Sequence, residues 1–323
     1  MAADPGGEPE SPPAAWSARA TYAAYRAGAT VAARLPDPVA AGVARSAARA
    51  ARAALGDRRD IVMRHQRRVA GPGVTEADLR RRVREVFESY GHYWMESFRL
   101  PRQTREAITN SMTIEGRDHL DAAFNDGRGV ILAAPHLGGW DFGGAWLAVE
   151  GYQPVAVVER LEPPELFEWF ARWRRELGLE IVPTGPEAGT AVLESLKQGR
   201  VVGLVSDRDL FGGGIPVEFF GEWTTLPAGP AMLALRTGAP LLPVAVFYAG
   251  RNHHRAVVQP PLDVTRGGRF RDDVQRVTQA VADALESLIA QAPGQWHLMQ
   301  PNWPSDPGWK HGPVEPPAHQ GAA

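Results

Sequence analysis

The chain of 323 residues contains no cysteine. This absence excludes disulfides, zinc sites built on thiolates, a cysteine nucleophile and an acyl-enzyme on cysteine. The sequence also contains no Gly-x-Ser-x-Gly turn of the kind that presents a nucleophilic serine in α/β-hydrolases. A catalytic base in this chain would therefore have to activate a nucleophile that belongs to a substrate.

Long apolar runs are also missing. A membrane-spanning helix needs roughly 18 consecutive apolar residues. The longest candidate, residues 231–250, is interrupted by Arg236, Gly238, Pro240 and Pro243. It is typical of a helix, a turn and a buried strand, so we expect any contact with a bilayer to be peripheral.

The two ends of the chain have no recognisable targeting signal. Residues 1–14 are acidic and rich in Pro and Gly, which is unlike a signal or transit peptide, and we predict that they are disordered. Residues 305–323, rich in Pro, Gly and His, are predicted to be a disordered tail. A single domain over 15–304 is expected on the cytoplasmic side, at the face of the plasma membrane.

Charge is unevenly distributed, although the net charge is only −2. Arginine is concentrated before residue 110, within Ala-rich segments 16–34 and 38–55 that are predicted to be helices. Trp16, Tyr22 and Tyr25 mark one side of the first helix. Arginine with aromatics on an amphipathic helix is typical of a membrane surface, and more often of core packing with a solvated basic face. Nucleic acid is a weaker prediction, because no clustered basic and aromatic platform is present.

The pattern indicates an N-terminal helical part over 15–110 and an α/β part over 111–304. The helical part ends with a long helix capped by Thr75 and interrupted near Gly91. After Gly129, short apolar runs alternate with amphipathic segments, which predicts a three-layer α/β/α sandwich with a mostly parallel sheet. Strands are expected at 130–134, 155–158, 180–183, 201–205, 215–220 and 242–247, and helices near 140–149, 164–177, 187–198, 228–237 and 271–290.

The segment APHLGGWD places His136 at the carboxyl end of the first buried strand. Ligands of open α/β sheets bind at this edge. Asp141 would lie in the first turn of the next helix, where the helix dipole favours a carboxylate, and the turn could fold it onto the His136 ring. A carboxylate on one imidazole nitrogen leaves the other free to act as a general base. A buried histidine satisfied by a nearby aspartate is the alternative.

A second polar group, Asp207, Arg208 and Asp209, follows the strand at 201–205 and is expected on the same edge as His136. A salt-bridge cluster at the rim is the alternative. Residues 212–214 are all glycine and are predicted to form a flexible loop over the site.

These segments together resemble a known family. The blocks are APHLGGWD, VVERLEPPELFEWFARWRRELG, VSDRDL, VEFFGE, PAGPAMLALRTGAPLLPV and WHLMQPNW, between about residues 80 and 303. They are similar to the lysophospholipid acyltransferase superfamily, in its branch of bacterial lipid A lauroyl and myristoyl acyltransferases. Within that branch the actinobacterial phosphatidylinositol mannoside acyltransferases are the most similar.

The resemblance implies the roles of individual residues. His136 corresponds to the base and Asp141 to its partner. Asp207 corresponds to a third carboxylate, which helps to hold the histidine and the acceptor, and the most similar members have glutamate at this position. Polar residues that line the acceptor pocket correspond to Glu159, which ends the second strand, and to Arg174, while Arg208 follows the third carboxylate. Gly139, Trp140 and Glu218 complete the expected substrate-binding set.

The resemblance also implies the reaction, in which acyl-CoA is the donor and a mannose hydroxyl of a phosphatidylinositol mannoside is the acceptor. Acyl-CoA would be a co-substrate, and no cofactor or metal is expected, since His253 and His254 have no third ligand at suitable spacing. The acyl chain is expected in a groove lined by Trp140, Phe142, Trp146, Phe219 and Phe220. Open alternatives are another lysophospholipid or glycolipid acceptor, an acyl-CoA thioesterase, and a membrane-bound scaffold without catalysis.

Overall fold

The computed structural model describes residues 22–316, apart from residues 24, 161 and 251. Its centre is a seven-stranded sheet in the order β1-β9-β8-β2-β5-β3-β4. These strands are β1 (Met112–Glu115), β2 (Val130–Ala134), β3 (Pro154–Val158), β4 (Glu180–Pro183), β5 (Val201–Val205), β8 (Leu241–Tyr248) and β9 (His254–Val258).

The sheet is mostly parallel. Neighbouring strands from β4 to β8 are all parallel, and the one antiparallel pair of the described sheet is β8 with β9. Strands such as VILAA in β2 are buried on both faces, as continuous apolar runs in parallel sheets are. In the register of β2 with β5, Ala134 lies opposite Val205. The residues that follow these two strands therefore emerge side by side.

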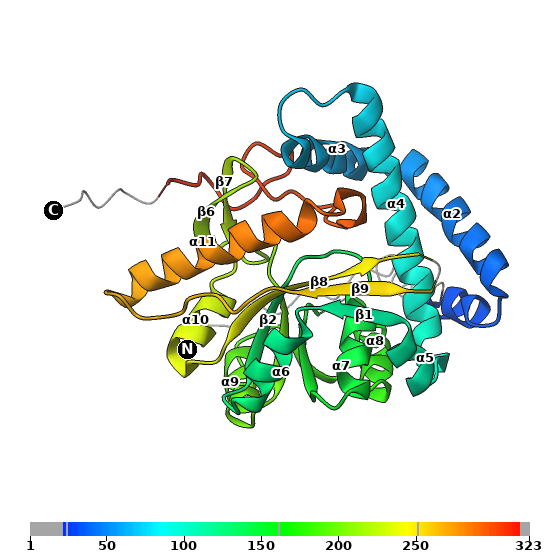
Figure 1. Ribbon diagram of the computed structural model, residues 1–323. Helices are drawn as coiled ribbons and strands as arrows, with labels where there is room; N and C mark the ends of the chain where they lie inside the picture. The colour runs from blue at the N-terminus through cyan, green and yellow to red at the C-terminus, as the bar shows by residue number, and fades with distance from the viewer. Residues whose placement is uncertain (1–21, 24, 161, 251, 317–323) are drawn as a thin grey trace, which may run out of the picture.

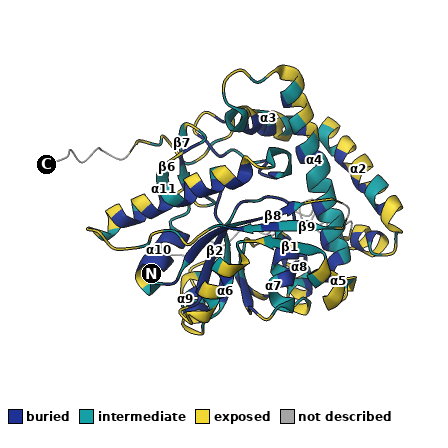
Figure 2. Ribbon diagram, viewed as in Figure 1, coloured by how far each residue is buried: buried dark blue, intermediate teal, exposed yellow. Residues whose placement is uncertain are grey.

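Helices cover both faces, which confirms the three-layer sandwich (Figure 1). One hydrophobic core joins the sheet to α9 (Ala188–Lys197), α10 (Gly229–Thr237) and α11 (Phe270–Ile289). A second core joins the opposite face to α6 (Arg117–Asn125), α7 (Trp140–Val149) and α8 (Pro164–Glu176). Figure 2 shows the buried sides of these helices turned toward the sheet.

The N-terminal helices α2 (Asp37–Ala54), α3 (Gly56–Ala70) and α4 (Glu76–Arg99) lie at one end of the sheet (Figure 1). Thr75 caps α4 by accepting a hydrogen bond from the Asp78 amide at 3.1 Å. The interruption expected at Gly91 is wrong, because α4 continues through it. A Cβ atom at Gly91 would lie 2.9 Å from the Ala44 carbonyl oxygen, so this glycine serves the close approach of α2.

Shorter elements complete the described chain. They are the 3-10 turns η1 (Leu100–Arg102) and η2 (Pro293–Gln295), α5 (Arg105–Asn110), and a hairpin of β6 (Ile215–Phe219) and β7 (Glu222–Leu226). The prediction that the disordered tail starts at residue 305 is wrong, because Asp306 is buried in the structure, with only 4% of its surface exposed. The expected disorder of residues 1–14 lies outside the described part. None of the described helices has the length and hydropathy of a membrane span.

Candidate active site

His136 lies in a tight turn between β2 and α7. Gly138 in this turn has a φ of +59°. A Cβ atom on it would lie 2.0 Å from the Val246 carbonyl oxygen, so glycine is required here. The Gly138 amide donates to the Gln295 carbonyl at 3.0 Å, and the Gly139 amide donates to Val246 at 2.9 Å. The turn is thereby fixed, and it holds the His136 side chain, 32% exposed, at the carboxyl edge of the sheet.

The carboxylate partner of His136 is Asp207. Its Oδ1 lies 2.6 Å from His136 Nδ1, and its Oδ2 accepts the His136 backbone amide at 2.9 Å. Asp207 is fully buried and also accepts the indole N–H of Trp296 at 2.7 Å. Burial raises the pKa of Asp207, but the charge and hydrogen bonds of His136 outweigh this, and the pKa is lowered. The carboxylate is therefore ionised and binds the Nδ1 proton.

The other ring nitrogen of His136, Nε2, has no hydrogen-bond partner among the residues that the structure describes. A hydrogen bond from Nδ1–H to a carboxylate places the neutral ring in the tautomer whose Nε2 carries a lone pair. The pair is thus arranged as a general base and its orienting group.

The pairing expected between His136 and Asp141 is wrong. Between these two described side chains there is no hydrogen bond. The Asp141 carboxylate instead accepts hydrogen bonds from Arg174 Nε at 2.8 Å and from a terminal nitrogen of Arg174 at 3.0 Å. It also accepts a hydrogen bond from the Tyr93 hydroxyl at 2.6 Å. The reason is topological, since α7 turns Asp141 toward α4 and α8, whereas β5 ends beside β2 and delivers Asp207.

The cluster around Asp141 is a buried ion pair. Side chains of Arg174 and Asp141 are 14% and 7% exposed. Burial lowers the pKa of Arg174, yet the charge of Asp141 outweighs it and the net shift is upward. Burial and the Asp141 charge raise the pKa of Tyr93 well above its usual range. Tyr93 therefore stays a neutral donor, and this cluster ties α4, α7 and α8 together.

Glu159 and Arg208 lie next to each other at the rim. Glu159 follows β3 and Arg208 follows the neighbouring β5, and their charged groups are 3.9 Å apart. The next residue, Asp209, accepts the amides of Phe211, Gly212 and Gly214 at 3.0, 3.0 and 2.8 Å. Asp209 thus binds backbone amides of the glycine loop, and the flexibility expected of this loop stays a prediction.

Trp140 borders the His136 ring. Its ring stacks on Tyr93 at 4.1 Å between centroids and meets His136 edge to face at 5.7 Å. Glu218, which we expected at the site, lies on β6 against α11, where its amide donates to Gln279 at 2.9 Å. No hydrogen bond or ion pair joins it to the described residues around His136.

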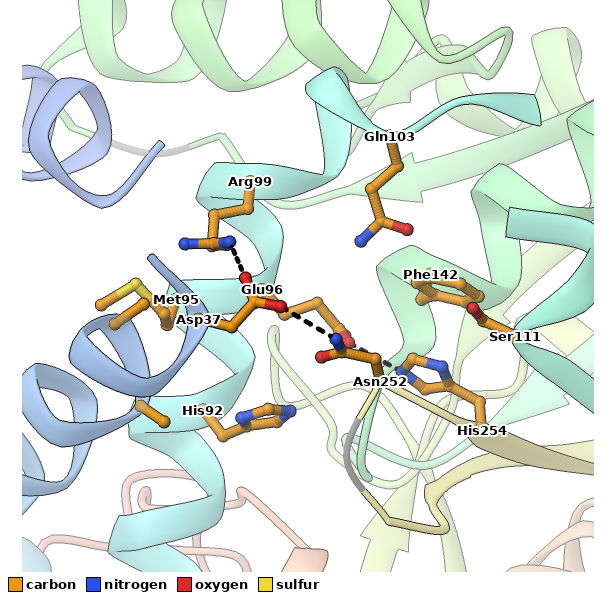
Figure 3. A pocket seen from close by; sticks show the side chains of 12 residues that line it. Asp37, His92, Met95, Glu96, Arg99, Gln103, Ser111, Phe142, Asn252 and His254 are labelled. Carbon is orange, nitrogen blue, oxygen red and sulfur yellow. Dashed lines mark hydrogen bonds and ion pairs between the residues drawn. The ribbon is translucent and has the colours of Figure 1, made fainter. Parts of the chain in front are cut away.

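A Cβ atom on Gly139 would lie 3.0 Å from the His254 ring and 3.1 Å from the Glu96 carboxylate. Both of these side chains line a separate pocket (Figure 3). There Glu96 binds His254 Nε2 at 2.8 Å, and His254 stacks on Phe142 at 3.9 Å between centroids. Asp37 binds Arg99 and accepts the Asn252 amide at 3.2 Å. These contacts leave His254 Nδ1 buried without a hydrogen-bond partner among the described residues. No cluster suited to a metal ion occurs in the described chain. Gly139 thus provides space for Glu96 and His254.

An apolar cavity of about 160 Å³ lies between α7 and the sheet. Trp140 and Asp141 line it from the first turn of α7, Arg174 lines it from α8, and Trp146 lines it farther along α7. Trp140 and Trp146 thus line the cavity as the sequence predicts, whereas Phe142 and Phe219 do not. Phe142 stacks on His254, and Phe219 stacks on Trp303 at 5.7 Å between centroids, in the core on the other face of the sheet.

Sequence reasoning missed residues of the final loop. Trp296 and Asn302 hold Asp207, since the Asn302 amide group donates to the Asp207 carbonyl at 3.1 Å. The His297 backbone amide donates to the His136 carbonyl at 2.7 Å. Burial and the nearby His136 lower the pKa of the His297 ring to about 3, so it stays neutral. The block WHLMQPNW carried the only signal for these roles.

Comparison with known proteins identifies the family of the chain. The sequence profile of the family described as bacterial lipid A biosynthesis acyltransferase matches residues 13–305. A phosphatidylinositol mannoside acyltransferase of Mycolicibacterium smegmatis is 39% identical over 288 residues, which cover 87% of this chain and 91% of that protein. One from Mycobacterium tuberculosis (strain CDC 1551 / Oshkosh) is 44% identical over 224 residues, 68% of this chain and 69% of that protein. A lipid A biosynthesis palmitoleoyltransferase of Escherichia coli (strain K12) is 23% identical over 242 residues, 74% and 76% of the two chains.

Proposed function

Because the chain belongs to the bacterial lipid A biosynthesis acyltransferase family, we propose that it transfers a fatty acyl group from acyl-CoA to a mannose hydroxyl of a phosphatidylinositol mannoside. The observation that carries this proposal is the His136–Asp207 pair with Nε2 left free at the carboxyl edge of the sheet. No cofactor is needed for the reaction, because acyl-CoA is consumed as a substrate.

In the proposed mechanism, His136 Nε2 removes the proton of the acceptor hydroxyl while its oxygen attacks the thioester carbonyl. The C–S bond then breaks, and the imidazolium returns the proton to the coenzyme A thiolate, so the histidine is regenerated. Asp207 stabilises the imidazolium between these steps. General-base catalysis of this kind contributes about 10²- to 10⁴-fold in rate.

The acceptor is proposed to lie at the rim formed by Glu159 and Arg208. The Glu159 side chain is 53% exposed and the Arg208 side chain 20% exposed, so both can reach a ligand. A carboxylate accepts hydrogen bonds from sugar hydroxyls, and a guanidinium donates to their oxygens or to a phosphate. This pair therefore suits an acceptor with a glycan and a phosphodiester.

The donor chain is proposed to enter the apolar cavity beneath α7. Trp140 lines this cavity and also contacts His136, which would place the thioester next to Nε2 when the chain is buried. Burial contributes about 0.8 kcal/mol for each methylene, so the hydrocarbon supplies most of the donor's affinity.

Membrane attachment is proposed through the exposed face of α2 and the helical residues before it. Val31, Val39, Val43 and Leu55 are 56%, 49%, 45% and 41% exposed. Arg34, Arg45, Arg49 and Arg52 are interspersed with them in the sequence. Apolar residues next to arginine suit the headgroup region of an anionic bilayer, at the cytoplasmic face of the plasma membrane.

The test is an assay with radiolabelled palmitoyl-CoA and purified phosphatidylinositol mannosides, with the product identified by mass spectrometry. We expect a singly acylated product on a mannose, and a loss of about 10²-fold or more in His136→Ala. Free fatty acid released at the same rate with and without acceptor would instead identify a thioesterase. If an acylated product formed with another glycolipid and not with phosphatidylinositol mannosides, the proposed acceptor would be wrong but the proposed mechanism would stand.

A further inference from the structure

The final loop, residues 296–306, contacts both members of the catalytic pair; we call it the C-terminal clamp. Trp296 and Asn302 donate hydrogen bonds to Asp207 at 2.7 and 3.1 Å, and the His297 amide donates to the His136 carbonyl at 2.7 Å. The position of this loop therefore sets the position of the carboxylate relative to the imidazole.

The clamp is itself held at Asp306, whose side chain is fully buried. Its Oδ2 accepts the amides of Asn302 and Trp303 at 3.0 and 3.2 Å. The same oxygen lies 3.1 Å from His65 Nε2, and Oδ1 lies 2.9 Å from the Arg68 guanidinium. Both basic residues belong to α3, so the clamp is fastened to the N-terminal helices.

His65 is buried with acceptors at both ring nitrogens. Nε2 faces the Asp306 carboxylate, and Nδ1 faces the Leu298 carbonyl oxygen at 3.2 Å. A carbonyl and a carboxylate can only accept, so the two contacts hold the imidazole ring from both sides. The neighbouring ion pair of Arg68 with Asp306 is also largely buried. A buried ion pair contributes little net stability compared with an apolar contact, and its use here is consistent with fixing one geometry.

We propose that His65 is a positioning residue for catalysis, because its bond to Asp306 fixes the clamp and thereby the alignment of Asp207 with His136. This inference rests on the proposed role of the His136–Asp207 pair. His65 contacts neither the catalytic pair nor the apolar cavity, and it acts through three links: Asp306, Asn302 and Asp207.

The first test compares His65→Gln and Asp306→Asn with the wild-type protein. Glutamine retains a donor but cannot contact both Asp306 and Leu298 as the imidazole ring does, and asparagine retains an acceptor. Because second-layer groups of this kind contribute about 10- to 100-fold, we expect kcat to fall by that factor with KM for palmitoyl-CoA unchanged. Arg67→Gln is the matched control, since Arg67 is on the same helix but 51% exposed and paired with Glu76, and it should keep wild-type kcat.

The decisive test places His65→Gln in an Asp207→Asn background. If His65 acts only by aligning Asp207, its loss should cause little further decrease in kcat once that carboxylate is gone. The proposal would be overturned if His65→Gln lowered kcat by the same factor in the Asp207→Asn background as in the wild-type background. It would also be overturned if both single variants kept a normal kcat and an intact near-ultraviolet circular dichroism spectrum. Full activity of Asp207→Asn alone would instead refute the catalytic pair, so the two failures can be distinguished.

Discussion

The Asp207 carboxylate accepts hydrogen bonds from three donors at once: the ring and the amide of His136, and the indole of Trp296. Replacing it with asparagine removes the negative charge that stabilises the imidazolium and can turn the ring to the wrong tautomer. We expect Asp207→Asn to lower kcat by about 10²- to 10⁴-fold. Initial rates of acyl transfer will measure this, and activity within a few-fold of wild type would contradict it.

Asp141 has a different role in the structure, and its substitution should have a different consequence. Asp141→Asn leaves the buried Arg174 guanidinium without its counter-ion, which costs about 3–5 kcal/mol. We therefore expect a large decrease in the free energy of unfolding in urea. Glu159→Gln is the control, because Glu159 is 53% exposed and forms only a 3.9 Å pair. An Asp141→Asn protein of wild-type stability would show that this ion pair does not hold α4, α7 and α8.

Asp306 links stability to pH. Its pKa is lowered to about 2, because the hydrogen bond and charge of His65 outweigh the upward effect of burial. Because the pKa of Asp306 is lower in the folded protein than in the unfolded chain, where it is about 4, its ionised form stabilises the fold. This stabilisation is fully present above the pKa of the unfolded chain and is lost as the pH falls toward about 2. The contribution is about 2 kcal/mol.

We therefore expect Asp306→Asn to lose less unfolding free energy than wild type between pH 6 and about pH 2.5. Urea titrations at the two pH values will measure the difference. Asp118→Asn, at a site whose side chain is 83% exposed, should behave like wild type. Equal acid sensitivity of the Asp306 variant and wild type would contradict the assignment.

From the residues alone, His136 and Asp207 were predicted on one edge of the sheet but not as a pair, and only the family resemblance implied that Asp207 helps to hold the histidine. Asp141 is close in sequence, whereas Asp207 is 71 residues away and becomes a neighbour only through the pairing of β2 with β5. Local spacing therefore favoured the wrong carboxylate. Trp296 and Asn302 could not be given roles, because nothing in their own segment indicates which residue they meet.

Among the elements, α7 and the strands below it enclose the apolar cavity. Gly203 of β5 lines this cavity, and a Cβ atom there would have its nearest neighbour at 3.8 Å. Gly203→Leu would fill space proposed for the donor chain. Each methylene excluded costs about 0.8 kcal/mol, or roughly fourfold in KM. KM should therefore rise more for palmitoyl-CoA than for octanoyl-CoA.

Gly203→Ala is the matched control, because it adds one carbon with little loss of volume. Steady-state kinetics with donors of different length will separate the two variants. Equal KM values of Gly203→Leu and wild type for palmitoyl-CoA would show that the chain binds elsewhere.

Elements were predicted well where burial dominates the sequence pattern. Buried apolar runs such as those of β2 and β5 have the expected bounds, and so does α7. β1, β9 and β7 were missed, because MTIE, HRAVV and EWTTL are short and mix polar with apolar residues. Such strands are defined by their partners. β1 pairs with β9, and the paired residues Met112 and His254 are 142 positions apart in the sequence.

For the whole molecule, the exposed valines of α2 are proposed to meet the bilayer. Val39→Asp with Val43→Asp adds two negative charges and removes apolar area from that face. We expect weaker binding to anionic vesicles in a flotation assay, with catalysis on detergent-dispersed acceptor retained. Gln198→Asp, on an exposed residue following α9, should bind vesicles as wild type does. Unchanged flotation of the double variant would exclude α2 as the attachment face.

The bond between His65 and Asp306 joins residues 241 positions apart, and its consequence concerns the timing of biosynthesis. At about 5–20 residues per second, roughly 10–50 s pass between translation of the histidine and translation of its partner. During that interval the sheet can form while His136 still lacks the loop that orients its carboxylate. A nascent chain should therefore remain catalytically silent at the ribosome and gain activity only after its last segment has emerged.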